Sequence, residues 1–242
     1  MKILLTGAYQ YTDLQISYFE RNGLETDFIQ YETDKVKRPE KYDAVICNGL
    51  FLHNNIEDFI RLKYIQLTSA GYDRVPMEYI KAHGIEIHNA RGVYSIPMAE
   101  WAVLKTLELY KQSRVFYKNQ SCGVWEKQRE LAELCGKTVT IAGCGSIGTE
   151  AAKRFRAFGV HITGVDLFEP VGQYYDEFVH VSRLKDTLEK TDVLVLTLPF
   201  TEETYHLIDG RCFDIMKNNA VLINTSRGKV VDETALTAAL KE

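Results

Sequence analysis

Short apolar runs alternate with longer segments of mixed polarity along the first part of the chain. Runs of four to six residues with this character are typical of buried strands. They cover Ile3–Thr6, Thr26–Gln30, Tyr42–Cys47, Lys63–Leu67 and Ile85–His88. Helices are predicted between them over Leu14–Asn22, Ile56–Leu62 and Met77–His83, while Lys35–Lys41, which contains Pro39, is predicted as a loop. Strands that alternate with helices predict a parallel sheet with helices on both faces.

The last part of the chain repeats this alternation. Apolar runs predict strands over Val139–Ala142, Phe178–Val181, Asp192–Leu198 and Ala220–Asn224. A further apolar run, which ends at Asp166, predicts another strand. Helices are predicted over Ser182–Lys190, Cys212–Lys217 and Asp232–Lys241, with Asp232 as the N-cap, and Thr201–Thr204 is predicted as a turn and helix start. The two halves therefore predict two α/β domains.

The middle of the chain differs from both ends. Ser95–Lys118 is predicted as a helix with Ser95 as its N-cap and Pro97 in its first turn, where proline is tolerated. Its portion Met98–Tyr110 is apolar on more than one side, so we expect a helix buried on several sides at the junction of two domains. Asn119–Glu133 is polar around Trp125 and is either an arm that reaches a second subunit or a surface loop.

A glycine-rich turn follows the run Val139–Ala142. Gly143, Gly145 and Gly148 have the G-x-G-x-x-G spacing of a dinucleotide-binding unit. In such a unit the first glycine permits a sharp turn, the second lets the backbone approach a pyrophosphate, and the third lets the helix pack closely on the strand. Ile147, Ala151, Phe155 and Phe158 give the following helix one apolar face that ends near Gly159. Glycine triplets also occur in plain turns, but this strand–turn–helix context favours phosphate binding at the helix N-terminus.

Asp166 ends the second strand of this unit, 18 residues after Gly148. A carboxylate at this position accepts hydrogen bonds from a ribose 2′-hydroxyl and repels a 2′-phosphate. We therefore expect NAD as the cofactor in preference to NADP.

Composition and charge narrow the class of protein. The 242 residues are 45% hydrophobic and 26% charged, which is ordinary for a globular protein, and the net charge is −4 with a pI of about 5.9. No basic run indicates nucleic-acid binding, and no segment is long enough to predict a membrane span or a signal peptide. The five cysteines contain no CxxC pair, so neither a metal site nor a disulfide framework is predicted and a cytoplasmic location is expected.

Two further motifs follow predicted strands, at the edge where open α/β sheets bind ligands. Backbone N–H groups of Ser69-Ala70-Gly71 are suited to a carboxylate, although a tight turn without a ligand is the commoner role. Arg227 follows the strand Ala220–Asn224 and is suited to gripping a 2-keto carboxylate and polarising its carbonyl. A surface arginine in a turn is the alternative.

Several segments together resemble the D-isomer-specific 2-hydroxyacid dehydrogenases, in the order and approximate spacing of that family. They are LKYIQLTSAGYDRVP (Leu62–Pro76), NARGVYSIPMAEWA (Asn89–Ala102), GKTVTIAGCGSIGTEAAKRFRAFG (Gly136–Gly159), LPFTEET (Leu198–Thr204) and INTSRGKVVDETAL (Ile223–Leu236). The resemblance implies two doubly wound parallel-sheet domains, a flavodoxin-like substrate domain over 1–97 and a Rossmann NAD-binding domain over 98–242. It implies hydride transfer between nicotinamide C4 and C2 of a 2-hydroxy or 2-keto acid, in a homodimer.

The resemblance also implies roles for individual residues. The turn Ser69–Gly71 holds the substrate carboxylate, with Ala70 and Gly71 as N–H donors, and Arg227 binds substrate as a catalytic residue. The cofactor is lined by the three glycines and by further residues of the same motifs. These are Ser146, Ile147, Asp166, Leu198, Pro199, Thr204, Thr225 and Ser226.

The sequence departs from the family after Arg227. Family members continue past a region like Ala235–Glu242 with a strand that carries a catalytic Glu, then a Pro-His pair whose His is the general acid/base. No counterpart of that Glu or His follows here, so the chain is expected to be shortened and Ala220–Asn224 to be a hydrophobic sheet edge. None of the six histidines matches the catalytic one, and each is predicted to be structural or solvated. They are His53, His83, His88, His161, His180 and His206.

Two functions from different classes therefore remain. The first is an NAD-dependent 2-hydroxyacid dehydrogenase, which Arg227 favours because cofactor binding alone does not require it. A positioned general acid contributes roughly 100- to 10,000-fold to the rate, so a chain without it is expected to have little activity. The second is therefore a non-catalytic NAD(H)-binding or interaction protein, of the kind represented by corepressors related to this family.

Overall fold

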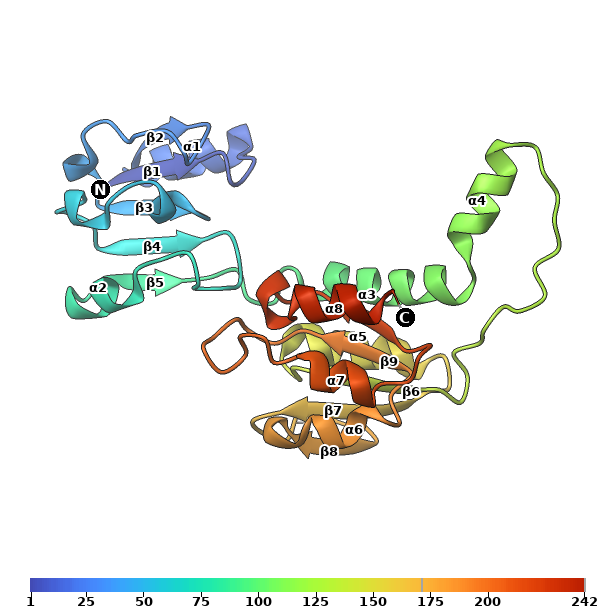
Figure 1. Cartoon of the computed structure of the whole chain (residues 1–242). Helices are drawn as coiled ribbons and strands as arrows, with labels where there is room; N and C mark the ends of the chain where they lie inside the picture. The colour runs from blue at the N-terminus through green and yellow to red at the C-terminus, as the bar shows by residue number, and fades with distance from the viewer. Residues whose placement is uncertain (171, 242) are drawn as a thin grey trace. The chain divides into compact units, whose positions relative to one another are not determined.

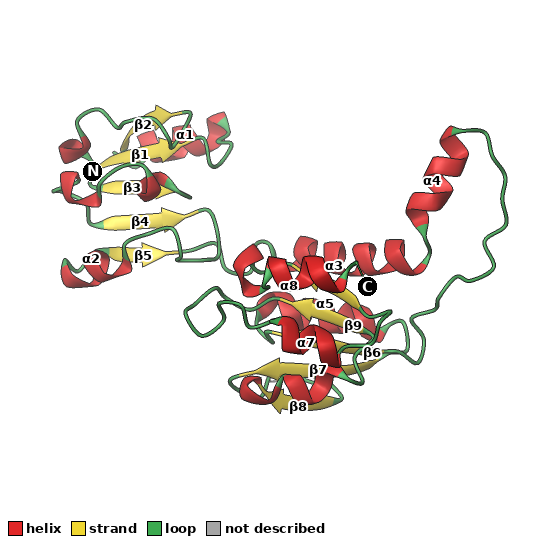
Figure 2. Cartoon of the chain, in the orientation of Figure 1, coloured by secondary structure: helices red, strands yellow, loops and turns green. Residues whose placement is uncertain are grey.

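The computed structural model describes residues 1–170 and 172–241. The chain divides into two compact units, Met1–Arg91 and Gly92–Glu242, and each contains one five-stranded sheet (Figures 1 and 2). All strand pairs in both sheets are parallel. The predicted class, two doubly wound α/β domains, is therefore the observed one.

The first unit has the strand order β2-β1-β3-β4-β5, the order of a flavodoxin-like sheet. Its strands are β1 (Lys2–Thr6), β2 (Glu25–Ile29), β3 (Ala44–Cys47), β4 (Tyr64–Leu67) and β5 (Glu86–His88). Its helices are α1 (Asp13–Arg21) and α2 (Met77–Ala82), with three short 3₁₀ turns at Pro39–Lys41, Leu50–Leu52 and Ile56–Asp58.

Alternate residues of the first sheet bury its two faces against different partners. Ile3 and Leu5 of β1 share a cluster with Ile16 and Phe19 of α1. Leu4, between them in the sequence, joins the larger cluster that includes Ile80 of α2 and the 3₁₀ turns. The period of two along a strand therefore decides which helix covers which face.

The second unit has the strand order β10-β9-β6-β7-β8, which matches a five-stranded Rossmann sheet. Its strands are β6 (Thr138–Ala142), β7 (His161–Asp166), β8 (Glu177–His180), β9 (Val193–Leu196) and β10 (Val221–Asn224). Its helices are α3 (Ser95–Tyr110), α4 (Ser113–Ser121), α5 (Ser146–Arg156), α6 (Lys185–Leu188), α7 (Gly210–Ile215) and α8 (Glu233–Ala239), with 3₁₀ turns at Val181–Arg183 and Gly228–Val230. As predicted, β10 is an edge strand, and Asp232 caps α8 by accepting from the N–H groups of Thr234 and Ala235.

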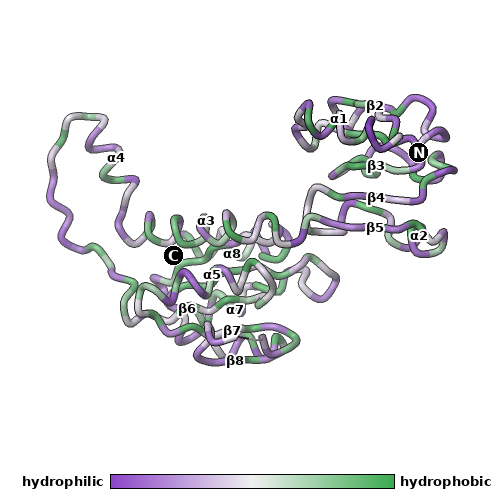
Figure 3. Tube along the Cα trace, turned by 180° about the vertical axis from the view of Figure 1, so that it is seen from behind, coloured by the Kyte–Doolittle hydropathy of each residue, from purple (hydrophilic) through white to green (hydrophobic). Residues whose placement is uncertain are grey.

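Two buried clusters hold the second sheet between layers of helices. On one face, Ile141 and Val195 pack with Ala102 of α3 and with Ala151 and Phe155 of α5. On the other face, residues of the same strands pack against α6, α7 and the segment before α8. Figure 3 colours this unit by hydropathy, and all four residues of the inner strand β9 are apolar and buried, as expected for a parallel sheet covered on both sides.

Helix α3 corrects three predictions. It ends at Tyr110, and the predicted continuous helix to Lys118 is broken where Gln112 adopts a left-handed φ of 50° before α4 begins. It is also buried on one side only, because Ala99 and Ala102 are inaccessible whereas Trp101 is 52% exposed. Ser95 is its first helical residue and not its N-cap, which is Tyr94.

Two other helix predictions were wrong for local reasons. Ile56–Leu62 forms only the 3₁₀ turn Ile56–Asp58 and further turns, because the buried side chains of Ile56, Phe59 and Leu62 are spaced by three and the N–H of Leu62 bonds to the carbonyl of Phe59. No helix starts at Thr201–Thr204, because the Thr204 hydroxyl accepts from the Thr201 N–H and donates to the Pro199 carbonyl, closing a turn.

Candidate functional site

The glycine-rich turn joins β6 to α5 as predicted, at the carboxyl end of β6. Gly143 adopts a φ of 100°, a conformation that favours glycine, and Gly145 is the N-cap of α5. Since β6 pairs with both β7 and β9, the turn lies where the strand order of the sheet reverses. That reversal is the point at which doubly wound sheets bind ligands.

Gly143 and Gly148 are glycines because neighbouring backbone leaves no room for a side chain. A Cβ on Gly148 would lie 1.9 Å from the carbonyl oxygen of Gly143, and one on Gly143 would lie 2.7 Å from the carbonyl carbon of Thr197. Thr197 also donates its hydroxyl to the Gly143 carbonyl at 2.5 Å. The sequence reasoning missed Thr197, although a polar residue directly after a buried strand was the available signal.

Gly145 is different because it is open. No heavy atom of the described residues lies within 4 Å of the position that a Cβ would take. The first N–H groups of α5, which include those of Ser146 and Ile147, have no partner within the helix because none exists at a helix start. An open glycine beside these donors fits a phosphate group that approaches the backbone closely.

Asp166 ends β7 and is bound to the same turn. Its Oδ2 accepts from the Cys144 N–H at 2.6 Å, and its Oδ1 accepts from the Leu167 N–H at 2.7 Å. A carboxylate has about four acceptor sites, so two bonds leave capacity for hydroxyl donors of a ribose.

Cys144, the residue between the first two glycines, faces inward. A Cβ on Gly164 would contact both the Cys144 sulfur and the ring of Tyr175. Burial raises the pKa of the Cys144 thiol to about 11, so it is protonated at neutral pH. The small residue at this position therefore serves packing under the turn.

The segment after β9 carries three predicted cofactor residues. Leu198 is buried, and Pro199 follows it, three residues after the end of β9. Thr204 is also buried, and its hydroxyl holds the turn Pro199–Thr204 closed through its bonds to Pro199 and Thr201. Its direct role is therefore to shape the loop beside the glycine turn.

The segment after β10 is organised by side-chain to backbone bonds. Asn224 accepts from the Ser226 N–H and donates to the Arg227 carbonyl, each at 2.9 Å. The Thr225 hydroxyl donates to the Leu196 carbonyl at 2.8 Å, which ties this segment to β9. These contacts set the backbone on which Arg227 is carried, and its Nη1 donates to the Ser226 carbonyl.

In the first unit, Ser69, Ala70 and Gly71 follow β4 as predicted. The Asn89 side chain, from the segment after β5, donates to the Ala70 carbonyl at 2.6 Å, and the Ala90 N–H donates to the Ser69 carbonyl. Asn89 fixes the orientation of this turn, and the sequence reasoning did not assign it this role.

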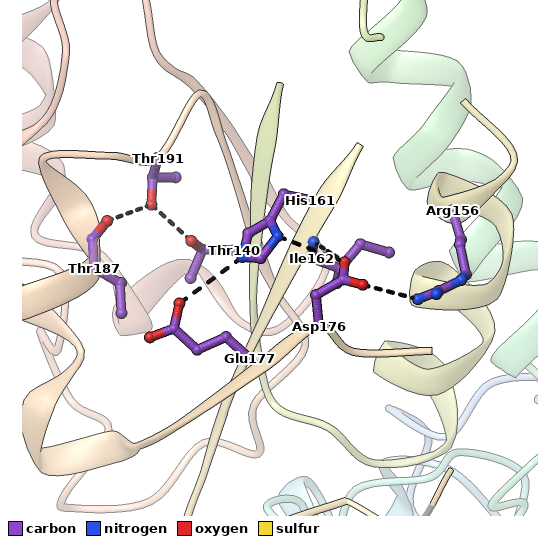
Figure 4. Close-up of polar contacts among 8 residues, drawn as sticks. All are labelled: Thr140, Arg156, His161, Ile162, Asp176, Glu177, Thr187 and Thr191. Atoms are coloured by element: carbon purple, nitrogen blue, oxygen red, sulfur yellow. Dashed lines mark hydrogen bonds and ion pairs between the residues drawn. The ribbon is translucent and has the colours of Figure 1, made fainter. Parts of the chain in front are cut away.

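The histidine side chains have varied surroundings. His161 lies at the amino end of β7, with its ring nitrogens 3.8 Å from the carboxylates of Asp176 and Glu177 (Figure 4). His83 bonds to the Tyr79 carbonyl, and His88 lies 2.7 Å from a Glu86 carboxylate oxygen. His180 bonds to Ser182, and His206 stacks on Tyr205 with a ring nitrogen 4.0 Å from Asp232.

Within residues 1–170 and 172–241, no three His, Cys, Asp or Glu side chains are grouped so as to hold a metal ion. Over these same residues, no helix has the length and apolar character needed to cross a membrane.

Residues 103–242 match the family description "D-isomer specific 2-hydroxyacid dehydrogenase, NAD binding domain". The chain belongs to the D-isomer-specific 2-hydroxyacid dehydrogenase family. The match covers the region that holds the glycine turn, Asp166 and Arg227.

Relatives of this dehydrogenase family extend the match into the first unit. A D-3-phosphoglycerate dehydrogenase of Archaeoglobus fulgidus is 28% identical over 246 residues, covering 100% of this chain and 46% of the relative. A glyoxylate reductase of Thermofilum pendens is 35% identical over 215 residues, covering 83% of this chain and 61% of the relative. The chain thus spans between 46% and 61% of the length of these two relatives. A D-lactate dehydrogenase from Aquifex aeolicus, solved with NAD and lactic acid, superposes with a TM-score of 0.83 at 25% identity, over 99% of this chain and 73% of that one.

Proposed function

We propose that this chain binds NAD(H) in its second unit and serves the oxidation or reduction of a small 2-hydroxy or 2-keto acid. Family membership supports the reaction class, and the open Gly145 at the start of α5 carries the cofactor assignment. When bound, the nicotinamide group supplies or accepts the hydride at C2 of the acid. The chain's own residues position the two reactants.

The cofactor is assigned to the carboxyl edge of β6, β7 and β9. Gly145, Ser146 and Ile147 take the pyrophosphate, because their backbone N–H groups and the α5 dipole favour negative charge. Asp166 takes the ribose hydroxyls, which favours NAD over NADP because its charge repels a 2′-phosphate. Leu198 and Pro199 line the cofactor, and the closed turn that Thr204 holds borders them.

A segment of the second unit, Thr225–Arg227, is assigned to the reacting end. Thr225 and Ser226 line the cofactor, and Arg227 is assigned to the substrate because a guanidinium binds a carboxylate in two parallel bonds and polarises a neighbouring carbonyl. The substrate carboxylate is assigned to the first unit, at the N–H groups of Ser69–Gly71.

We also propose a homodimer, which α4 and the following arm support. Helix α4 has no buried residue, although it carries Phe116 and Tyr117, and Trp125 of the arm is 88% exposed. Figure 1 shows α4 projecting from the body of its unit. An isolated helix of nine residues is marginal in water, so a second copy that covers these side chains would stabilise it.

Non-catalytic NAD(H) binding is the second candidate. It is the alternative because none of the six histidines corresponds in sequence to the catalytic His of the family, and His161, for example, lies at the amino end of its strand. A dehydrogenase needs an acid/base at the opposite, carboxyl edge of the sheet.

One assay separates the two candidates. The purified chain is mixed with NADH and, in turn, glyoxylate, pyruvate and hydroxypyruvate, and the loss of NADH absorbance is followed. Turnover that Arg227→Ala reduces by 100-fold or more, with NADH affinity retained, would establish the dehydrogenase. NADH binding without turnover of any 2-keto acid would establish the second candidate, and absence of NADH binding by folded protein would contradict both.

A further inference from the structure

The strand order of the first sheet reverses between β1 and β3, and the protein places one of its own carboxylates there. Sheets with this order bind ligands beyond the carboxyl ends of these two strands. Thr6 is the last residue of β1, and Asn48 and Gly49 directly follow β3. Glu32, from the loop after β2, extends its side chain to all three of them.

The contacts have the form of a bound carboxylate. Glu32 Oε1 accepts from the Thr6 hydroxyl at 2.8 Å and from the Asn48 N–H at 2.7 Å, while Oε2 accepts from the Gly49 N–H at 2.6 Å. All three donors are neutral, and hydrogen bonds from such donors to a charged acceptor are short and strong. Two successive backbone N–H groups that converge on one anion are a recurrent anion-binding arrangement.

The donors are held in place without the Glu32 side chain. Thr6 is fully buried within β1, and β1 and β3 pair directly. Asn54, itself buried, donates to the main-chain carbonyls of Glu32 and Asp34, and its Oδ1 accepts from the Val36 N–H. The loop that carries Glu32 is therefore tied to the loop after β3 by Asn54 as well as by the carboxylate.

The carboxylate lies against the backbone of Gly49 without crowding it. A Cβ on Gly49 would lie 3.5 Å from Glu32 Oε2, in ordinary contact, so the site does not depend on a glycine at this position. Removing the carboxylate would leave the N–H groups of Asn48 and Gly49 without their acceptor, whereas the Thr6 hydroxyl would keep the Ile46 carbonyl at 3.1 Å as an acceptor. Unpaired N–H donors of this kind are costly when shielded from water.

We propose that the Thr6 hydroxyl and the N–H groups of Asn48 and Gly49 form a binding site for a small carboxylate, with Glu32 as its built-in ligand. The site is distinct from the Ser69–Gly71 turn after β4. The site needs neither the cofactor nor the second unit, so an experiment can support or contradict it independently of the proposed function. While Glu32 fills it, a free carboxylate that reaches the first unit is left with the Ser69–Gly71 turn.

Chemical rescue of Glu32→Ala in the full chain tests this site. We expect a melting temperature below that of the wild type, which sodium formate raises and sodium chloride of equal concentration does not. By mass action, each tenfold increase in formate above its dissociation constant raises the melting temperature by roughly 5 °C or more. If the variant is recovered only unfolded, refolding in formate but not in chloride supports the site, and no recovery in either contradicts it.

Two matched control variants show whether formate stabilises Glu32→Ala by binding at this site. Glu32→Gln keeps the space filled but turns an amide N–H₂ toward an N–H donor, so it should be less stable than the wild type and insensitive to formate. Asp34→Ala removes an exposed carboxylate two residues away and should respond to formate as the wild type does.

Hydrogen exchange gives a local readout that a general stabilising effect would not reproduce. In Glu32→Ala the peptide that contains Asn48 and Gly49 should exchange faster than in the wild type, and formate should restore its protection. Equal responses to formate and chloride, or equal rescue of Glu32→Gln, would overturn the proposal.

Discussion

Substituting alanine at two glycines of the same turn separates packing from cofactor binding. At Gly148 the new Cβ would lie 1.9 Å from the Gly143 carbonyl oxygen, whereas real contacts of this kind are longer than 3.0 Å, so the helix start must move by about 1 Å. At Gly145, whose φ is −69°, the new Cβ would meet no heavy atom of the described residues within 4 Å. The first change should therefore damage the fold, and the second should chiefly affect a ligand that touches the backbone, with a smaller loss because alanine caps a helix less well than glycine.

The expected magnitudes follow from these contacts. Overpacking of this kind costs about 1–3 kcal/mol, which lowers the melting temperature of a unit of this size by roughly 2–12 °C. Gly145→Ala places a poorer N-cap on α5, which costs at most about 1 kcal/mol or roughly 2–4 °C, but it should bind NADH at least about tenfold more weakly, a loss of about 1.4 kcal/mol. Gly210→Ala, where a Cβ would lie 3.8 Å from that of Ala235, is the control that should change neither property.

Circular dichroism melts and NADH fluorescence titrations measure both effects on the same samples. The reasoning would be refuted if Gly148→Ala melted like the wild type, because the backbone contact would then not be limiting. It would equally fail if Gly145→Ala bound NADH with unchanged affinity, because the pyrophosphate would then not pass over this glycine.

Three further predictions concern charge and assembly. Asp166→Ala should raise the dissociation constant for NADH about tenfold or more and that for NADPH less, because it removes both a ribose acceptor and a repulsive charge; equal losses in titrations would contradict the assignment. The Lys41 ammonium, 2.6 Å away, and the Tyr42 hydroxyl lower the pKa of Asp27 to about 2, so its stabilisation is complete above about pH 4 and is lost as the pH falls toward 2. In urea unfolding, Asp27→Asn should therefore be less stable than the wild type at pH 6 and converge with it near pH 2, and a constant difference would argue against this ion pair. Trp125→Ala should shift the chain toward monomer in sedimentation equilibrium, and a monomeric wild type would refute the proposed dimer.

The sequence predicted the parts of this molecule that follow from local chemistry. The spacing of Gly143, Gly145 and Gly148 predicted the turn after β6, and the acid at position 166 was predicted at the end of the next strand, where the structure has it. The parallel sheets were predictable because buried parallel strands are short continuous apolar runs. The spacing of residues along the sequence was therefore enough to predict most residues of the candidate cofactor site.

Contacts between distant segments could not be predicted in the same way. The exposed side of α3 was missed because apolar residues such as Trp101 and Leu104 look alike whether a neighbour within the chain or a second copy covers them. Glu32 was missed because its donors, Thr6 and Gly49, are far from it in sequence and meet it only once β1, β2 and β3 pair. No periodic pattern marks a polar residue of this kind.

Titration of the intact chain with NADH and with NADPH by isothermal calorimetry is the most direct test of the central claim, that the second unit holds NAD(H) at the glycine turn and Asp166. We expect one NADH per chain, with affinity for NADH at least about tenfold higher than for NADPH. Folded protein that binds neither dinucleotide, or that binds NADPH more tightly, would contradict it.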